Sequence, residues 1–396
     1  MSINHTASAN RLHIGIFGKR NSGKSTLINA LTGHQTSLVS DIAGTTTDLV
    51  YKTIEIHGIG PCVLIDTGGF DDSGQLGEMR VDKTRVAMEK ADIALVLFTE
   101  EDTSLELEWI NEFRTRNTPV IPLINKIDTI ENTDAIHRKI AKQCNDKPIC
   151  ISALTKLGIE EIREAIIRKL PEDYDSRDIT GNLVQENDIV LLVMPQDIQA
   201  PKGRLILPQV QTIRELLDKK CIVVSSTVNK LPQALAALSN PPKLIITDSQ
   251  IFPAVFEIKP AESLLTSFSV LFAALKGDIE YFTESAAIID RLTVDSKVLI
   301  AEACTHVPLS EDIGTVKIPN LLRKKIGEGL TIDNVHGNDF PEDLKGYDLI
   351  IQCGSCMFNR KFVLNRMAKA QDQQVPMTNY GIALAHLSGI LDKISS

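Results

Sequence analysis

The sequence predicts an α/β fold with three domains: a doubly wound sheet that carries a phosphate-binding loop, followed by two further α/β domains. Two observations predict it. Short apolar runs of strand length recur along the chain and alternate with stretches of helical pattern, which is typical of parallel sheets covered by helices on both faces. A polar, turn-rich segment interrupts this alternation at residues 173–184, where a linker is expected.

The expected organisation is a flexible leader over 1–10, a first domain over 11–172, a linker over 173–184, a second domain over 185–260 and a third over 261–396. A chain of 396 residues favours two or three domains, at about 100–200 residues each. Hydrophobic residues make up 43% and charged residues 23%, which provides enough apolar material for buried cores.

Composition also excludes several classes of protein. The longest apolar runs, such as residues 91–98, are far shorter than the roughly 20 residues of a membrane-spanning helix. The first residues lack a secretory-signal pattern, so we expect a cytoplasmic protein whose seven cysteines are thiols or metal ligands and not disulfides. A net charge of -9 gives no general attraction to nucleic acid or to anionic membranes.

The first motif is a phosphate-binding loop. An apolar strand from Leu12 runs into GKRNSGKST, and a helical pattern, LINALTG, follows. A nucleotide phosphate site requires this order, because backbone N–H groups of the loop and of the helix start surround the phosphates. We expect Lys24 to contact the β- and γ-phosphates and Ser25 to bind magnesium. The predicted phosphate-binding set is Gly18, Ser22, Gly23, Lys24, Ser25 and Thr26.

Two more segments supply the expected contacts to magnesium and to the γ-phosphate. A strand ends in Asp66, which should hold the magnesium shell, and in Gly69, whose amide should meet the γ-phosphate. The segment AGTTTD, residues 43–48, lies where a switch closes over the γ-phosphate, with Thr46, or else Thr45, as the threonine that contacts magnesium. Lys24, Thr46 and Asp66 are expected to support hydrolysis, and no residue is identified as the catalytic group.

The base is predicted to be guanine. An apolar strand over 119–124 ends in Asn125, Lys126 and Asp128. A carboxylate at position 128 can accept two hydrogen bonds from guanine, whereas adenine offers no such pair of donors. The next apolar strand leads to Ser152, Ala153 and Leu154, whose backbone can approach the guanine O6. These motifs predict that the first domain is a P-loop GTPase that binds GTP or GDP with magnesium.

The pairing of AGTTTD with Asn21 resembles the TrmE-Era-type GTPases. That resemblance implies a potassium ion beside the phosphates, held in part by Asn21. Phe70 stands where Ras-like proteins have a glutamine that positions water, so slow hydrolysis is expected. Asp71, Asp72 and Glu78 are candidates to orient the water; the alternative is that they are solvated loop carboxylates.

The second domain reads as a small α/β unit without a catalytic cluster, and its APKGR segment, residues 200–204, lacks the glycines of a phosphate loop. A structural or dimerisation role is favoured. In the third domain a helix is expected over LLTSFSVLFAALKG, and LRKKI is interpreted as the polar face of another helix.

The third domain carries a candidate metal site. One apolar strand, 296–303, ends on Cys304-Thr-His306, and a second, 347–352, ends on Cys353 and Cys356. In a parallel sheet these ends lie at one edge. Cys353 and Cys356 are expected at the start of a helix, where thiolates are favoured. An iron–sulfur cluster is favoured over structural zinc and over plain core or redox cysteines.

The other cysteines and two further histidines are not expected to bind a metal. The cysteines are interpreted as small buried hydrophobic residues (Cys62, Cys144, Cys150, Cys221) and the histidines as side chains with hydrogen-bond partners (His336, His386).

Nearly the whole chain resembles the maturation GTPases of FeFe hydrogenases, HydF. The resemblance rests on AGTTTD, APKGRLILPQVQTIRELLD, ITDSQ, LTSFSVLFA, KGD, AEACTH and CGSCM. It implies a GTP-binding domain, a dimerisation domain and a domain in which Cys304, Cys353 and Cys356 bind a 4Fe-4S cluster. It also implies a homodimeric scaffold that assembles or carries the di-iron precursor of the H-cluster, with radical-SAM maturases and apo-hydrogenase as partners.

The family pattern often has a histidine directly before its C-x-x-C pair, and this chain has Gln352 there. Three cysteines then leave one iron open to an exchangeable ligand, for which His306, Glu302 and water are candidates. Two other functions fit part of the sequence. A tRNA-modification or ribosome-assembly GTPase fits the first domain but gives the cysteines no role. An iron–sulfur redox enzyme with nucleotide gating fits the cysteines but lacks a recognisable substrate pocket.

Overall fold

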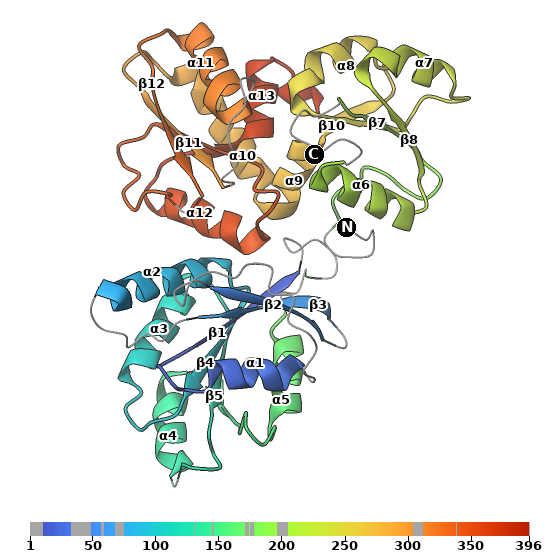
Figure 1. Ribbon diagram of the computed structural model, residues 1–396. Helices are drawn as coiled ribbons and strands as arrows, with labels where there is room; N and C mark the ends of the chain where they lie inside the picture. Colours follow the sequence, from blue (N-terminus) through green and yellow to red (C-terminus); the bar gives the residue numbers. More distant parts are fainter. Residues whose placement is uncertain are drawn as a thin grey trace. The chain divides into compact units, whose positions relative to one another are not determined.

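The computed structural model describes residues 11–32, 49–56, 59–67, 75–130, 132–144, 146–170, 174, 178–195, 205–303, 312–337 and 339–395, with the backbone alone for 75–82. The chain divides into two compact units, residues 1–174 and 175–396. The first unit contains one sheet and the second contains two (Figure 1).

The first unit is built on a six-stranded sheet of order β2-β3-β1-β4-β5-β6. Its strands are β1 (Leu12–Gly18), β2 (Val50–Ile56), β3 (Gly60–Asp66), β4 (Ile93–Phe98), β5 (Val120–Ile124) and β6 (Ile149–Cys150). Its helices are α1 (Lys24–Thr32), α2 (Gln75–Lys90), α3 (Ser104–Thr115), α4 (Thr133–Gln143) and α5 (Ile159–Arg168).

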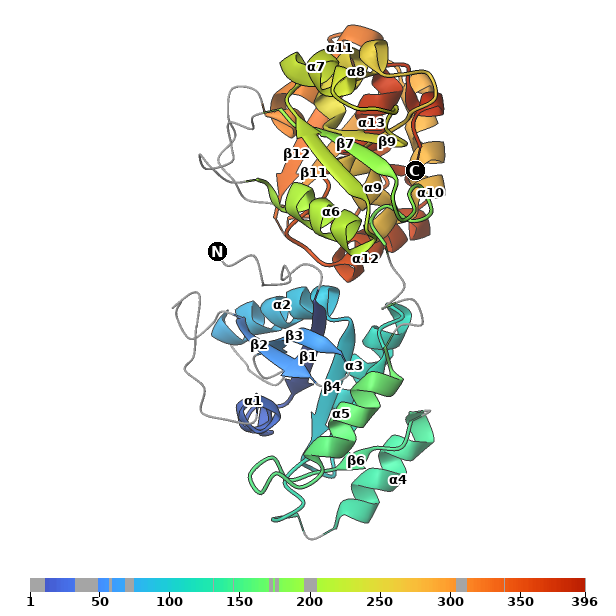
Figure 2. The ribbon, with the colours of Figure 1, turned by 90° about the vertical axis from the view of Figure 1, so that its right-hand side faces the viewer.

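Helices cover both faces of this sheet, as the apolar strands predict. Alternate residues of β1 point to opposite faces, because side chains alternate along a strand. Ile14 and Ile16 belong to the core that α1 and α5 cover, whereas Phe17 belongs to the core under α2, α3 and α4. The ring of Phe17 meets Phe113 of α3 edge-on, with centroids 4.7 Å apart. Figure 2 shows the sheet between these helices.

One strand of the first sheet differs from the prediction of a parallel sheet. β2 pairs antiparallel with β3, with Val50 opposite Asp66 and Ile56 opposite Gly60. The sheet is therefore mixed. Only three residues of the sequence separate the end of β2 at Ile56 from the start of β3 at Gly60, and only antiparallel neighbours can be joined so briefly. β2 escaped the sequence analysis because Val50 and Tyr51 are exposed at the sheet edge and its residues alternate with polar ones.

The second unit begins with a parallel four-stranded sheet of order β10-β9-β7-β8. Its strands are β7 (Ile189–Val193), β8 (Ile222–Ser226), β9 (Leu244–Thr247) and β10 (Leu264–Ser267). Around them lie α6 (Leu207–Asp218), α7 (Leu231–Ala236), α8 (Phe252–Ile258) and the short helices η2 (Val228–Lys230) and η3 (Ser249–Ile251).

The helix predicted over LLTSFSVLFAALKG begins four residues later than expected. Leu264–Ser267 form β10 and pair with β9, and α9 spans Phe268–Lys276. Ser267 sets this boundary, because its Oγ accepts a hydrogen bond from the backbone N–H of Val270 (3.2 Å) and caps the helix. β10 belongs to the sheet of β7, β8 and β9, although the predicted boundary at 260 assigns these residues to the third domain.

The third sheet is also parallel, with order β12-β11-β13-β14. Its strands are β11 (Lys297–Glu302), β12 (Thr331–His336), β13 (Leu349–Gln352) and β14 (Met377–Asn379). The helical segments are α10 (Ile279–Ala286), η4 (Ala287–Arg291), the π-helical turn η5 (Ile313–Lys317), α11 (Ile318–Ile326), α12 (Arg360–Asp372), α13 (Tyr380–Leu387) and η6 (Leu391–Lys393). α11 contains LRKKI, as predicted.

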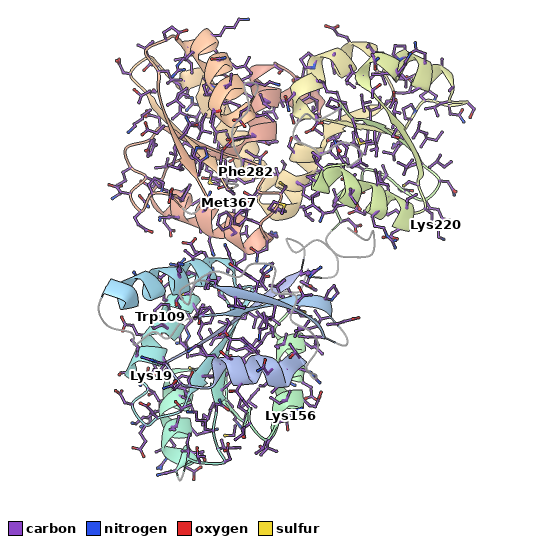
Figure 3. All side chains as sticks on the ribbon, viewed as in Figure 1. Lys19, Trp109, Lys156, Lys220, Phe282 and Met367 are labelled. Atoms are coloured by element: carbon purple, nitrogen blue, oxygen red, sulfur yellow. The ribbon has the colours of Figure 1, made fainter. Side chains whose placement is uncertain are left out.

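The two sheets of the second unit share one apolar core. Leu191 and Ile245 of the first sheet belong to the same cluster as Phe282, Leu299 and Met367. Figure 3 labels Phe282 on α10 and Met367 on α12 within this core. α9 contacts α6 beside the first sheet and α12 and α13 beside the second. Among the described residues, no helix has both the length and the apolarity that crossing a membrane requires.

Candidate nucleotide site and cysteine site

The phosphate-binding loop has the predicted context, between β1 and α1. Lys24 is buried, and its Nζ donates to the carbonyl oxygens of Gly18 (2.9 Å) and Lys19 (2.8 Å), so the ammonium lies across the loop. Gly23 has a φ of +93°, and a Cβ there would collide with the Asn125 side chain. Glycine at this position therefore permits both the turn and the close approach of the guanine motif.

Asn125 connects three of the predicted segments. It is buried at the end of β5, where its Nδ2 donates to the carbonyl of Ser22 in the phosphate loop (2.8 Å). Its Oδ1 accepts a hydrogen bond from the backbone N–H of Ala153 (3.0 Å). One amide side chain thus holds the phosphate loop and the Ser152–Leu154 segment together.

The two described magnesium candidates lie in direct contact. Ser25 Oγ donates to Asp66 Oδ2 over 2.9 Å, so the hydroxyl of α1 and the carboxylate of β3 face one point. Burial raises the pKa of Asp66, while the Ser25 hydrogen bond and the nearby Lys24 ammonium act in the opposite direction. A hydroxyl and a carboxylate are oxygen ligands of the kind that magnesium prefers, so this pair fits the predicted ion.

The residues expected around the base lie at the same end of the sheet. Asp128 is exposed, which leaves its carboxylate accessible to a ligand, and Leu154 is also exposed. Ser152 is buried, and its Oγ accepts from the N–H of Thr155 (3.2 Å). Asn21 and Lys126 both have left-handed backbones, with φ of 59° and 63°, which place them in tight turns.

Sequence reasoning missed an acidic anchor beside the phosphate loop. Lys19 Nζ donates to the carbonyl of Asp102 (2.7 Å) and lies 3.5 Å from Glu100 and 3.7 Å from Glu106. Glu106 is buried in the first turn of α3, and this burial raises the pKa of its carboxyl. Lys19 and α3 lie on the same side of the sheet (Figure 3). The sequence feature that could have indicated this contact is the run of acidic residues after β4, at positions 100–102.

Several predicted residues lie outside the described part of the chain. They are Thr45 and Thr46 of the switch, Gly69, Phe70, Asp71 and Asp72 after β3, the APKGR segment, and Cys304 and His306 after β11. The side chain of Glu78 also lies outside the described set. Their roles stay predictions.

The carboxyl ends of the four strands of the third sheet meet at one edge. Glu302 of β11 pairs with His336 of β12, Ala301 pairs with Gln352 of β13, and Gln352 pairs with Asn379 of β14. Cys353 follows directly. Its Sγ accepts a hydrogen bond from the backbone N–H of Ala303 over 3.1 Å. The residue that precedes Cys304 in the sequence is therefore in contact with Cys353.

The expected helix start at the cysteines is wrong. α12 begins at Arg360, after the N-cap Asn359, so Cys353 and Cys356 lie in the loop that precedes it. The helix dipole acts mainly within the first turn and gives these thiols little support. Burial raises the pKa of Cys353, which favours the neutral thiol in the metal-free protein. A bound metal would have to displace that proton.

The other polar residues at this edge have partners of their own. Glu302 is buried; its Oε1 accepts from the Tyr380 hydroxyl (3.1 Å) and its Oε2 lies 3.0 Å from His336 Nδ1. Gln352 is buried and its Nε2 donates to Ser355 Oγ (3.2 Å). His336 is therefore satisfied, as predicted, and so is His386, which lies 3.1 Å from Asp290.

The four remaining cysteines only partly fit the prediction of buried hydrophobes. Cys62 and Cys221 are buried, but Cys144 is half-buried and Cys150 is exposed. Cys150 is exposed because β6 is a two-residue strand at the sheet edge. In the part of the chain that the structure describes, no group of three metal-ligating side chains occurs.

Three family models match the chain. The Hydrogen maturase F tetramerization domain matches residues 280–395, and the Hydrogen maturase F dimerization domain matches residues 179–277. A third model, described as a 50S ribosome-binding GTPase, matches residues 13–126. The matches to the two maturase models account for nearly all of the second compact unit.

Curated relatives match a smaller share of the chain. GTPase Der from Streptococcus pyogenes serotype M5 (strain Manfredo) is 35% identical over 42% of this chain and 38% of its own length. The tRNA modification GTPase MnmE from Aquifex aeolicus (strain VF5) is 32% identical over 40% of this chain and 34% of its own length. The chain thus spans well under half the length of either relative.

Solved structures give weaker similarities. Era from Aquifex aeolicus bound to GDP.AlF4- has a TM-score of 0.34 and 22% identity, and covers 57% of this chain and 98% of its own. The G domain of the T. maritima FeoB iron transporter has the same TM-score and identity, and covers 41% of this chain and 99% of its own.

Proposed function

We propose that this chain, which belongs to the HydF-type hydrogenase maturase GTPases, is a scaffold on which GTP controls an iron–sulfur site used in hydrogenase maturation. The observation that carries the proposal is the contact between Ala303 and Cys353. It brings the two strand ends that carry the predicted cluster ligands together in a chain that also has a guanine nucleotide site.

In the nucleotide half, each described residue has a definite task. Lys24 would contact the β- and γ-phosphates in place of the loop carbonyls, and Ser25 and Asp66 would hold magnesium. Thr46, outside the described residues, would complete the magnesium ligands. Asn125 holds the loop and Asp128 reads guanine. Hydrolysis is slow, and a potassium ion at Asn21 would accelerate it.

In the cysteine half, Cys304, Cys353 and Cys356 would hold a 4Fe-4S cluster. The donor set fits, because thiolates are the usual ligands of such clusters. Glu302 is engaged with Tyr380 and His336, and the amide of Gln352 is a poor iron ligand, so neither is the first choice for the fourth iron. His306 or an exogenous ligand then takes that position. Such a cluster supplies an iron site at which a di-iron precursor can attach.

The proposed assembly is a homodimer, or a higher oligomer, that receives the di-iron unit from radical-SAM maturases and delivers it to apo FeFe-hydrogenase. The dimerization and tetramerization models that match the second unit support association between copies of the chain. Neither nucleic acid nor membrane is a proposed partner.

The cluster is tested by anaerobic reconstitution of the full chain, followed by electron paramagnetic resonance. Cys304→Ser, Cys353→Ser and Cys356→Ser should each lose or strongly weaken the 4Fe-4S signal. Cys150→Ser is the matched control, because its thiol is exposed in the other unit, and it should load like the wild type. Zinc bound at unit stoichiometry without an iron spectrum would reject the scaffold function.

A second assay separates this function from that of a tRNA-modification or ribosome-assembly GTPase. The loaded chain is incubated with apo FeFe-hydrogenase, and hydrogen evolution is followed. Activation is expected with the wild type and not with Cys353→Ser. A loaded wild-type chain that activates no hydrogenase would contradict delivery, even if its cluster is intact.

A further inference from the structure

A buried lysine holds the loop that carries Cys353 and Cys356. Lys276 is the last residue of α9 and is only 3% exposed, although lysine is rarely buried without a reason. Its Nζ donates to the carbonyl oxygens of Ser355 (2.8 Å), Cys356 (3.3 Å) and Phe358 (2.8 Å). An ammonium has three N–H donors, which matches the number of carbonyls that converge on it.

The loop conformation depends on this convergence. Ser355 is buried and has a left-handed backbone, with a φ of 46°, which is unfavourable for a residue other than glycine. Carbonyl dipoles that point at one position repel each other unless a cation lies between them. Lys276 provides that cation, and it comes from a helix nearly eighty residues earlier in the chain.

We propose that Lys276 is a positioning residue that fixes the Cys353–Cys356 loop and places a buried positive charge beside the cluster. This inference rests on the proposed cluster function. A cluster held by thiolates is anionic, and it gains a further negative charge on reduction. A nearby cation in a low-dielectric site therefore raises the reduction potential.

The chain offers a matched control. Lys259 Nζ also donates to three backbone carbonyls, those of Pro260 (3.0 Å), Ala261 (3.4 Å) and Ser263 (2.8 Å). That contact closes the connection between α8 and β10, beside the other sheet of the unit. Lys259→Met therefore removes the same kind of anchor without touching the cysteine loop.

The first measurement is the reduction potential of the reconstituted full chain, determined by a redox titration in which electron paramagnetic resonance detects the reduced cluster. Lys276→Met should lower the potential and the iron content, whereas Lys276→Arg, which keeps the charge, should stay close to the wild type. Lys259→Met should match the wild type. If Lys276→Met does not fold, Lys276→Gln replaces it, because that side chain keeps hydrogen-bond donors without the charge.

The second measurement uses the metal-free chain, and it separates this inference from the cluster proposal. The labelling rate of Cys353 by a thiol reagent is read by peptide mass spectrometry. Lys276→Met should increase it several-fold, and Lys259→Met should not. Equal potentials and equal labelling rates in wild type and Lys276→Met would overturn the inference. If the wild-type chain takes up no iron, the proposed cluster and the effect of Lys276 on its reduction potential are both rejected. The labelling rate of Cys353 still tests whether Lys276 fixes the loop.

Discussion

At the scale of single residues, Asn125 links the phosphate loop to the segment beside the base. It is buried, and both ends of its amide are used, by the Ser22 carbonyl and the Ala153 N–H. Asn125→Ala should weaken GTP binding roughly tenfold or more, because each buried group left without a partner costs about 1–3 kcal/mol.

Titration calorimetry with a GTP analogue checks this. Asn111→Ala is the control, because that side chain is exposed on α3, where its Oδ1 accepts from Arg114. Equal affinities for wild type and Asn125→Ala would show that the two hydrogen bonds of the amide do not contribute to nucleotide binding.

A second residue-scale prediction concerns pH. Burial lowers the pKa of His13 below its usual 6.5, despite the nearby Asp92 carboxylate. The unfolded chain therefore binds a proton at higher pH than the folded chain. This contribution to stability is complete above about pH 6.5 and is lost as the pH falls below it.

Urea unfolding of the first unit can be followed by tryptophan fluorescence, because Trp109 is the only tryptophan in the chain. The midpoint should fall more steeply between pH 7 and pH 5.5 in the wild type than in His13→Asn. Parallel curves would show that His13 is not the group responsible.

Residues of the nucleotide motifs could be predicted because short-range spacing fixes them. Asn125 contacts the phosphate loop at Ser22 and Gly23, and Lys24 lies across the same loop, as expected for one ligand site. The contacts of Lys19 with Glu106 and of Lys276 with the cysteine loop were not predicted, because the acidic run after β4 does not show which cation it meets. Each contact joins residues that are tens of positions apart, and a lysine or glutamate in a sequence reads as a surface residue.

At the scale of elements, the packing of α2 against α3 predicts that the fluorescence of Trp109 responds to the nucleotide. Trp109 of α3 is buried in the same core as Ala87 and Met88 of α2, and α2 follows the segment after Asp66. A change at the γ-phosphate that shifts α2 should alter the surroundings of the indole. We expect the fluorescence of Trp109 to differ between GTP-analogue and GDP complexes.

Trp109→Phe supplies the blank for this experiment, and Asp128→Ala, which should lose guanine recognition, supplies the control without nucleotide. Identical spectra with both nucleotides would indicate that α2 does not move against α3.

The strands that the sequence predicts most directly are the buried ones. β4 is apolar along its whole length and β1 departs from that only at His13, and this pattern is visible in sequence. β2 and β12 were missed because their exposed and half-buried residues include Lys52, Glu55 and Asp333. α12 begins later than predicted because Asn359 caps it, and no apolar periodicity separates the cysteine loop from the helix in the sequence.

At the scale of the whole molecule, the edge of the first sheet in the second unit is a candidate dimer contact. β8 is an edge strand, and Ile222 on it is 53% exposed. Val210 and Leu217 of the neighbouring α6 are also exposed. Unpaired strand edges with apolar side chains favour association. Ile222→Lys should shift the chain towards the monomer, as measured by size-exclusion chromatography with light scattering.

Ile167→Lys is the control, because Ile167 is exposed on α5 of the other unit, and it should keep the wild-type mass. If Ile222→Lys keeps the same mass at the same concentration, another surface carries the dimer.

The predicted three-domain organisation accounts for the three sheets, but the second and third sheets form one compact unit. Sequence patterns show strands and helices, and they do not show which helix faces two sheets at once. α9 does so, since it contacts α6 as well as α12 and α13.

The placement of Lys276 has a consequence for how this architecture can be taken apart. It is the penultimate residue of the segment matched by the dimerization model, 179–277, whereas both cysteines that it serves lie in the segment matched by the tetramerization model, 280–395. The two segments are therefore not interchangeable cassettes. A chimera that combines the two segments from different family members takes Cys353 and Cys356 from one protein and the lysine that binds their loop from the other. A truncated chain that begins at residue 280 contains the cysteines without Lys276.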